Sequence, residues 1–302
     1  MKGKLIVFVF LLMTARAVSC DVCALFTDIT PNAQKSRVGY VMRFRLNSGH
    51  WGNTYRHGDV NANLSHGIIV RESFQNYELR GRFRMNDRFF LSANLPVKMT
   101  SRAVSNQLVL GLSGISDPFL MGSYNLVLPE EGQKFKQRFS FGLGVKAPIG
   151  KIDKQYNGQE VDLDYQPGTG SWDLLAQLEE IFKVKEYGFS LNVLSRINGW
   201  SPNHQFGHSI NLNTHFFYTF SKDENSIMPF VGMYSEFVAK DRDRDEIFEN
   251  SGGNQYFVSA GANVILNKFS FRINYQYAVV NKIFGYQIPT KNQFTVGAFY
   301  NF

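Results

Sequence analysis

Long apolar runs are what this sequence most clearly lacks. Beyond the amino-terminal segment, no stretch of the 302 residues approaches the ~18 uninterrupted apolar residues of a membrane-spanning helix, so transmembrane helices are excluded. Charged residues are also few, at 19%. Loss of Lys2, Lys4 and Arg16 with the amino-terminal segment lowers the formal net charge from +7 to +4. This mild and diffuse excess gives no basis for nucleic-acid binding.

Motifs for catalysis and phosphate binding are scarce as well. Gly142-Leu-Gly144 lies in an expected strand with no helix after it, which disqualifies it as a phosphate-binding turn. Histidines lie near serines in the second half of the chain, but no nucleophile elbow surrounds either serine. A hydrolase is therefore the less favoured alternative. Its candidate residues are Ser201, His204, His208, Ser209 and His215.

Aromatic residues and period-two alternation, in contrast, are abundant. The chain contains 28 Phe and 14 Tyr. In residues 76–85, Gly81 and four apolar residues alternate strictly with polar ones, which predicts a β-strand with one apolar and one charged face. The charged face does not suit the dry interior of a soluble sandwich. It suits a strand between lipid and a water-filled lumen, so the sequence predicts an all-β fold, a transmembrane antiparallel β-barrel.

The same pattern recurs in about twelve segments of roughly ten residues, the length that crosses a bilayer at a tilt. Long connections, expected at 47–67, 100–116 and 150–170, alternate with short turns. Long loops outside the cell and short turns in the periplasm are typical of Gram-negative outer-membrane barrels. An even strand number then places both termini in the periplasm. Because Pro96 removes one ladder donor, we expect a local irregularity there.

The amino terminus has the features of a secretory signal. Lys2 and Lys4 precede an apolar run at 5–13, and small residues follow up to Ser19. We therefore divide the chain into a cleaved signal peptide (1–19), a periplasmic segment (20–35) and the barrel (36–302).

The only cysteines, Cys20 and Cys23, lie at the start of the periplasmic segment. As a pair they could form a disulfide or hold Cu(I) in an oxidising envelope, which predicts a copper- or redox-linked role. Alternatively, Ala17-Val-Ser-Cys20 resembles a bacterial lipobox, in which case Cys20 is acylated and Cys23 is incidental. Haem attachment is excluded because Ala24 stands where His is required.

Three motifs resemble a known family. They are Gly114-Ile-Ser-Asp-Pro-Phe-Leu-Met-Gly-Ser-Tyr-Asn-Leu126, Gly142-Leu-Gly-Val-Lys-Ala-Pro-Ile-Gly150 and Gln166-Pro-Gly-Thr-Gly-Ser-Trp-Asp173. They are similar to segments of the transporter or phenol meta-degradation (MetA-type) outer-membrane barrels, and Cys20-Asp-Val-Cys23 resembles the start of Bacteroidetes-type members. The resemblance implies a channel for small molecules, with aromatic or fatty substrates in some members. It also implies that the closing aromatic Phe302 is read by the barrel-assembly machinery.

Basic residues dominate the predicted inward face. They could give the lumen a positive field that favours anionic solutes. Alternatively, they pair with Glu78, Glu179 and Glu236 and merely fill a narrow barrel. The inward bases are Arg43, Arg45, Arg80, Arg82, Arg84, Lys98, Arg138, Lys146, Arg196 and Arg272.

Two loops carry potential metal ligands. His50, His57 and His66 share the first long loop with Asp59 and could bind Zn²⁺ or Cu²⁺, although solvated loop histidines are the simpler interpretation. The alternate aspartates that begin at Asp241 resemble a calcium loop but lack its central glycine. No other cofactor is expected. The sequence thus predicts an outer-membrane channel that contacts lipid and passes small solutes, and not an enzyme.

Overall fold

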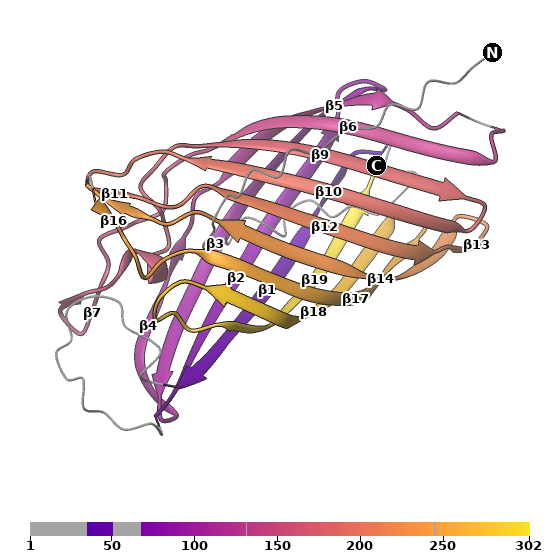
Figure 1. The fold of residues 1–302 in the computed structure, drawn as a ribbon. Helices are drawn as coiled ribbons and strands as arrows, with labels where there is room; N and C mark the ends of the chain where they lie inside the picture. The colour runs from indigo at the N-terminus through magenta and orange to yellow at the C-terminus, as the bar shows by residue number, and fades with distance from the viewer. Residues whose placement is uncertain (1–34, 51–67, 131, 245) are drawn as a thin grey trace, which may run out of the picture.

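The computed structural model describes residues 35–50, 68–130, 132–244 and 246–302, which form a closed antiparallel β-barrel with twelve wall positions (Figure 1). Two wall positions are each shared by two consecutive strands, β4 with β5 and β12 with β13. The wall strands are β1 (Arg37–His50), β2 (Ile69–Arg84), β3 (Phe89–Val104), β4 (Gln107–Ile115), β5 (Phe119–Val127), β6 (Phe135–Lys146), β9 (Asp173–Val184), β10 (Tyr187–Asn198), β12 (Ser209–Tyr218), β13 (Phe220–Lys222), β14 (Asn225–Val238), β17 (Gly253–Leu266), β18 (Phe269–Ile283) and β19 (Thr290–Asn301).

Each wall position pairs with the next one along the chain, and β1 pairs with β19 to close the wall. Closure gives each of the twelve wall positions a partner on both sides, although in the described chain β4 itself pairs only with β3 and β13 only with β14. The predicted barrel class and strand count are confirmed. Within the described residues, no α-helix is long and apolar enough to cross a membrane.

The connections divide the barrel into two ends. At the short-turn mouth lie residues 85–88, 128–134, 185–186, 223–224 and 267–268, and there Phe302 N donates to Ser36 O at 2.8 Å. At the long-loop mouth lie the short strands β7 (Gln155–Tyr156), β8 (Gln159–Glu160), β11 (His204–Gln205), β15 (Arg242–Asp243) and β16 (Glu246–Ile247). Figure 1 shows β7, β11 and β16 at one end and β13 near the other.

Alternation along each strand sorts side chains between lipid and lumen as the sequence predicts. In β2, Leu79 is 55% exposed on the outside, whereas its neighbour Glu78 is fully buried in the lumen. The outward face is an apolar band that continues around the wall. Aromatic side chains mark its ends, including Tyr187, Phe220 and Phe269 near the short turns and Trp172 and Trp200 near the long loops. This is the surface expected to face lipid.

Two sequence expectations need correction. Residues 100–116 were expected to form a long loop, but β3 continues to Val104, a tight turn places Ser105 and Asn106 at positive φ, and β4 returns. These strand ends lie beyond the apolar band, where the lipid–lumen alternation is weak. Pro96 does not interrupt β3 itself. The interruption lies in the facing strand at 116–118, where Ser116 N donates to Pro96 O at 2.9 Å.

Candidate functional site

The lumen is the site at which the wall, one long loop and most buried charges meet. The 147–172 loop between β6 and β9 contains β7, β8 and a 3₁₀ turn, Leu163–Tyr165. Its Tyr165 is buried, stacks on Phe74 at 5.9 Å between ring centroids and donates a hydrogen bond to Glu72. Thr100 Oγ1 donates to Tyr165 O at 2.8 Å. Part of this loop therefore folds into the barrel and narrows the long-loop mouth.

A buried lysine fixes the two ends of this loop. Lys146, at the end of β6, lies 2.8 Å from Asp117 Oδ2 and 2.9 Å from Asp173 Oδ2, and only 1% of its side chain is exposed. Lys146 and Asp173 are direct cross-strand partners, so the ion pair lies where the loop leaves and rejoins the wall. A buried ion pair is retained only when its remaining polar atoms are also satisfied.

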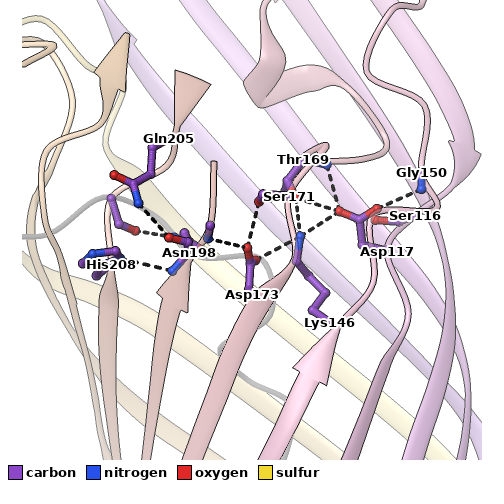
Figure 2. Close-up of polar contacts among 12 residues, drawn as sticks. Ser116, Asp117, Lys146, Gly150, Thr169, Ser171, Asp173, Asn198, Gln205 and His208 are labelled. Carbon is purple, nitrogen blue, oxygen red and sulfur yellow. Dashed lines mark hydrogen bonds and ion pairs between the residues drawn. The ribbon is translucent and has the colours of Figure 1, made fainter. Parts of the chain in front are cut away.

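Asp117 satisfies that condition by accepting bonds from the loop. Gly150 N donates to its Oδ1 at 2.8 Å, and Thr169 donates to its Oδ2 through both N and Oγ1 at 2.8 Å (Figure 2). Ser171 Oγ donates to Asp173 Oδ1 at 2.8 Å. We call Asp117, Lys146, Gly150, Thr169, Ser171 and Asp173 the Lys146 network. Figure 2 shows Lys146 between the two aspartates, with Asn198 at the end of β10 and His208 just before β12 to one side.

The glycines of the same motifs allow a close backbone crossing inside the loop. A Cβ on Gly168 would lie 2.1 Å from Gly150 O, and one on Gly150 would lie 2.5 Å from Gly168 Cα. No larger residue fits at either position without moving the backbone. All three motifs that carry the family resemblance therefore converge on the Lys146 network and this crossing.

A belt of ion pairs crosses the middle of the lumen. Glu78 accepts from Arg43 Nε at 2.9 Å, Arg80 Nε at 2.8 Å and Asn94 Nδ2 at 2.9 Å. Arg45 pairs with Glu236, although three strands (β19, β18 and β17) separate β1 from β14 in the wall. Tyr234 Oη donates to Glu236 Oε1 at 2.7 Å. The belt thus comprises Arg43, Arg45, Glu78, Arg80, Asn94, Tyr234 and Glu236.

Two cavities lie on either side of the belt. The outer cavity, of about 170 Å³, is bounded by the 147–172 loop and includes Asn47, Glu72 and Phe74 in its lining. The inner cavity, of about 90 Å³, includes Val41 and Arg82. Along β1, the inner cavity reaches Val41 and the outer cavity begins at Asn47, so Arg43 and Arg45 lie between them.

Most predicted inward bases lie in the lumen, and several have the predicted acidic partners. Arg43 and Arg80 pair with Glu78, Arg45 with Glu236, and Arg138 Nη2 with Glu179 Oε2 at 3.1 Å. Lys98 Nζ donates to Asp164 O at 3.0 Å.

The other predicted bases lie in different surroundings. Arg82 lies over Phe90 at 4.5 Å, Arg272 over Phe230 at 5.4 Å, and Arg196 lines the outer cavity. Arg84 differs from the expectation, because it lies at the short-turn mouth beside Asp87 rather than deep in the lumen.

The remaining predicted site residues are only partly described. Cys20, Cys23, His57, His66 and Asp59 lie outside the described residues, as does the side chain of His50. In the described part of the chain, no group of three or more His, Cys, Asp or Glu residues is placed to hold a metal ion. The copper and loop-histidine hypotheses therefore stay predictions.

The histidines considered for hydrolysis have structural neighbours. His215 points inward as predicted and packs edge-on against Phe230 at 4.6 Å. His208 Nδ1 accepts from Asn198 N at 3.1 Å. At the long-loop mouth, His204 Nε2 lies 3.9 Å from Asp241 Oδ2, which is longer than a hydrogen bond. A Ser or Asp within hydrogen-bond reach of a His at the outer rim would favour a hydrolase, and His204 and Asp241 do not meet that condition.

Sequence reasoning missed the residues that hold the loop. The sequence analysis assigns no role to Asp117, Thr169 or Asp173 beyond their place in the motifs. It predicts that Tyr165 lies in a polar loop. The sequence signal that could have found Asp117, Thr169 and Asp173 is that each belongs to one of the motifs that carry the family resemblance.

Comparison with solved structures identifies the fold. An outer-membrane channel from Pseudomonas putida superposes with a TM-score of 0.64, covering 91% of this chain and 100% of that chain at 11% identity. This chain has an outer-membrane β-barrel fold. The β domain of the Bordetella autotransporter Brka gives a TM-score of 0.47 (13% identity, 88% and 100% coverage), and a Pseudomonas aeruginosa FadL homologue gives 0.43 (12% identity, 90% and 93% coverage). No protein-family model and no curated protein sequence matches the chain.

Proposed function

We propose that this protein is an outer-membrane channel for small solutes. The observation that carries the proposal is the combination of a closed barrel, an apolar outer band and a polar lumen with cavities of about 170 and 90 Å³ in series. The outer band fits lipid, and a lumen lined by charged and amide side chains fits a hydrated route. The short-turn mouth then faces the periplasm.

Two further observations support this proposal. The solved barrel from Pseudomonas putida is described as an outer-membrane channel. The segments that resemble the transporter or phenol meta-degradation family form the Lys146 network, which positions the loop at the mouth. On that basis we extend the family's role in small-molecule passage to this chain. We also propose that Phe302, at the short-turn mouth, is the signal for barrel assembly.

The lumen favours small solutes because the belt limits the passage. Arg45 and Glu236 join parts of the wall that three strands separate, so a solute must pass beside this pair or displace it. Inner-cavity bases outnumber acids, with Arg37, Arg80, Arg82 and Arg272 against Glu179. This balance favours anions over cations, because fixed charges lining a narrow passage attract the opposite sign.

Planar-bilayer recordings with the refolded full chain test the proposal. We expect discrete conductance steps and a reversal potential on the anion side in a salt gradient. Arg82→Gln should reduce the anion preference, because Arg82 lines the inner cavity. Arg84→Gln is the matched control and should change it little, because Arg84 lies beside Asp87 at the mouth. Absence of conductance in correctly folded protein would contradict the channel, and cation selectivity would contradict the bias.

A copper- or redox-linked role of Cys20 and Cys23 is the second proposal. Its basis is the Cys-x-x-Cys spacing in the predicted oxidising envelope. It is compatible with a channel, because the periplasmic segment precedes the barrel. Intact mass of the mature protein distinguishes it from acylation of Cys20.

A further inference from the structure

We propose that the outer cavity binds the carboxylate of a small, mainly apolar monocarboxylate, with Arg196 as its anchor. This inference rests on the proposed channel function and specifies a substrate class for it. Arg196 lies near the end of β10, lines the outer cavity and is only 6% exposed. Within the described parts of the chain its buried Nε has no hydrogen-bond partner, and its side chain forms no ion pair.

A buried guanidinium without an ion pair lowers the stability of the folded protein. Removing a charged group from water without a partner carries a penalty of several kcal/mol in real proteins. Natural structures therefore pair such groups or use them to bind a counter-charge. Because arginine cannot lose its proton at physiological pH, Arg196 stays charged and its desolvation penalty remains. An anion in the cavity would satisfy it.

The strand beside Arg196 presents further unsatisfied donors. Ser209 on β12 is the direct cross-strand partner of Arg196, and Asn211 lies two residues further along the same face. Ser209 Oγ and Asn211 Nδ2 are both buried without a hydrogen-bond partner in the described chain. Of these three donors only Arg196 lines the outer cavity, and its guanidinium presents N–H donors to a carboxylate, which offers only acceptors.

Three of the acids around the outer cavity are held by other groups. Asp117 binds Lys146 and the loop, Glu236 binds Arg45, and Glu72 accepts from Tyr165 with Arg102 Nε 4.0 Å away. Asp162 is exposed to solvent, and Asp164 accepts a hydrogen bond from Lys98 through its backbone O. None of these carboxylates pairs with Arg196 in the described structure. The wall thus offers Arg196 no internal counter-ion.

The size and lining of the outer cavity define the rest of the ligand. Phe206, Val238, Ile283 and Ile288 contribute an apolar side to it. Its volume of about 170 Å³ is close to that of an engineered cavity of about 150 Å³ that holds a benzene ring. The ligand class is therefore a carboxylate attached to an apolar body of about one ring, and benzoate is a suitable probe.

Equilibrium binding to the full chain in detergent micelles tests the site, by calorimetry with benzoate, its neutral isostere benzamide, and acetate. Benzoate should bind at least tenfold more tightly than either. Arg196→Gln should weaken benzoate binding about ten- to hundredfold, the worth of a charged hydrogen-bonding pair, and leave benzamide binding within about twofold. Arg196→Lys should retain most of the benzoate preference. Arg82→Gln, the same substitution in the inner cavity, is the matched control and should change benzoate affinity little.

Three results would overturn the site. The first is equal affinity of the unmodified protein for benzoate and benzamide, and the second is unchanged benzoate affinity in Arg196→Gln. The third is a loss of benzoate affinity in Arg82→Gln equal to that in Arg196→Gln, which would indicate a general positive field in the lumen rather than a site. Heat-modifiable migration on a gel verifies folding, and the benzoate–benzamide comparison needs no variant. A conducting protein without benzoate preference refutes only this site. A protein that binds benzoate but conducts nothing refutes only the channel.

Discussion

Replacing Asp117 with Asn should release the 147–172 loop from the mouth without unfolding the barrel. Asp117 accepts four hydrogen bonds, one from Lys146 Nζ, one from Gly150 N and two from Thr169. The amide keeps one acceptor oxygen and turns an NH₂ group toward donors. It also leaves Lys146 with Asp173 alone as its buried counter-charge.

The magnitude follows from the bonds lost. Hydrogen bonds to a charged group contribute about 1.5–3 kcal/mol each, against about 1 kcal/mol for neutral ones. Loss of charge at Asp117 should therefore weaken the loop's attachment by about 3 kcal/mol, which raises the ratio of released to attached loop roughly hundredfold. The wall ladders are not involved, so global stability should change little.

Hydrogen exchange followed by mass spectrometry measures this directly. The loop amides bonded to Asp117, Thr169 N and Gly150 N, should exchange about a hundredfold faster in Asp117→Asn, because exchange there requires release of the loop. Amides of β6 and β9 should keep their rates. Asp87→Asn provides the matched control, since it is the same chemical change on an exposed carboxylate at the opposite mouth. Unchanged loop exchange in Asp117→Asn would refute the role assigned to the Lys146 network.

Three further predictions follow from the belt, the loop crossing and the cysteines. Glu236→Gln removes the acid that pairs with Arg45 across the lumen, so single-channel conductance should rise and anion preference increase; a fall in both would contradict the belt's role. Gly168→Ala should displace the loop, because the new Cβ would lie 2.1 Å from Gly150 O, and limited proteolysis should then cut within 147–172. For Cys20 and Cys23, intact mass should show a loss of two hydrogens or a retained copper ion, whereas a lipid-sized increment would refute the paired-thiol role.

The wall was predictable because a β-strand between lipid and water has a period of two. Leu79 outside and Glu78 inside follow from alternation alone, and the short turns follow from strand spacing. Where a strand no longer separates lipid from water, the sequence pattern no longer predicts it. Beyond the apolar band, the last four residues of β3, up to Val104, and the returning strand β4 lack the burial alternation that revealed the other strands.

The site was harder to predict because alternation gives the face of a residue and not its position around the barrel. Arg45 and Glu236 were both assigned inward, but their pairing across the lumen depends on barrel circumference and strand stagger. Tyr165 was unpredictable for another reason. Its loop has a polar sequence, and its entry into the lumen depends on contacts with Glu72, Phe74 and Thr100 from distant segments.

The pairing of β1 with β19 has a consequence for the order in which the barrel can form. Eleven of the twelve ladders join wall positions that follow each other in sequence and can form as local hairpins. The twelfth joins Arg37 to Asn301 and so requires nearly the whole chain to be in place. Contacts of high sequence separation dominate slow folding steps. A larger residue at Gly39 would crowd this ladder, because its Cβ would lie 2.2 Å from Ala298 O. Such a substitution should therefore delay closure of the barrel while leaving the individual hairpins intact.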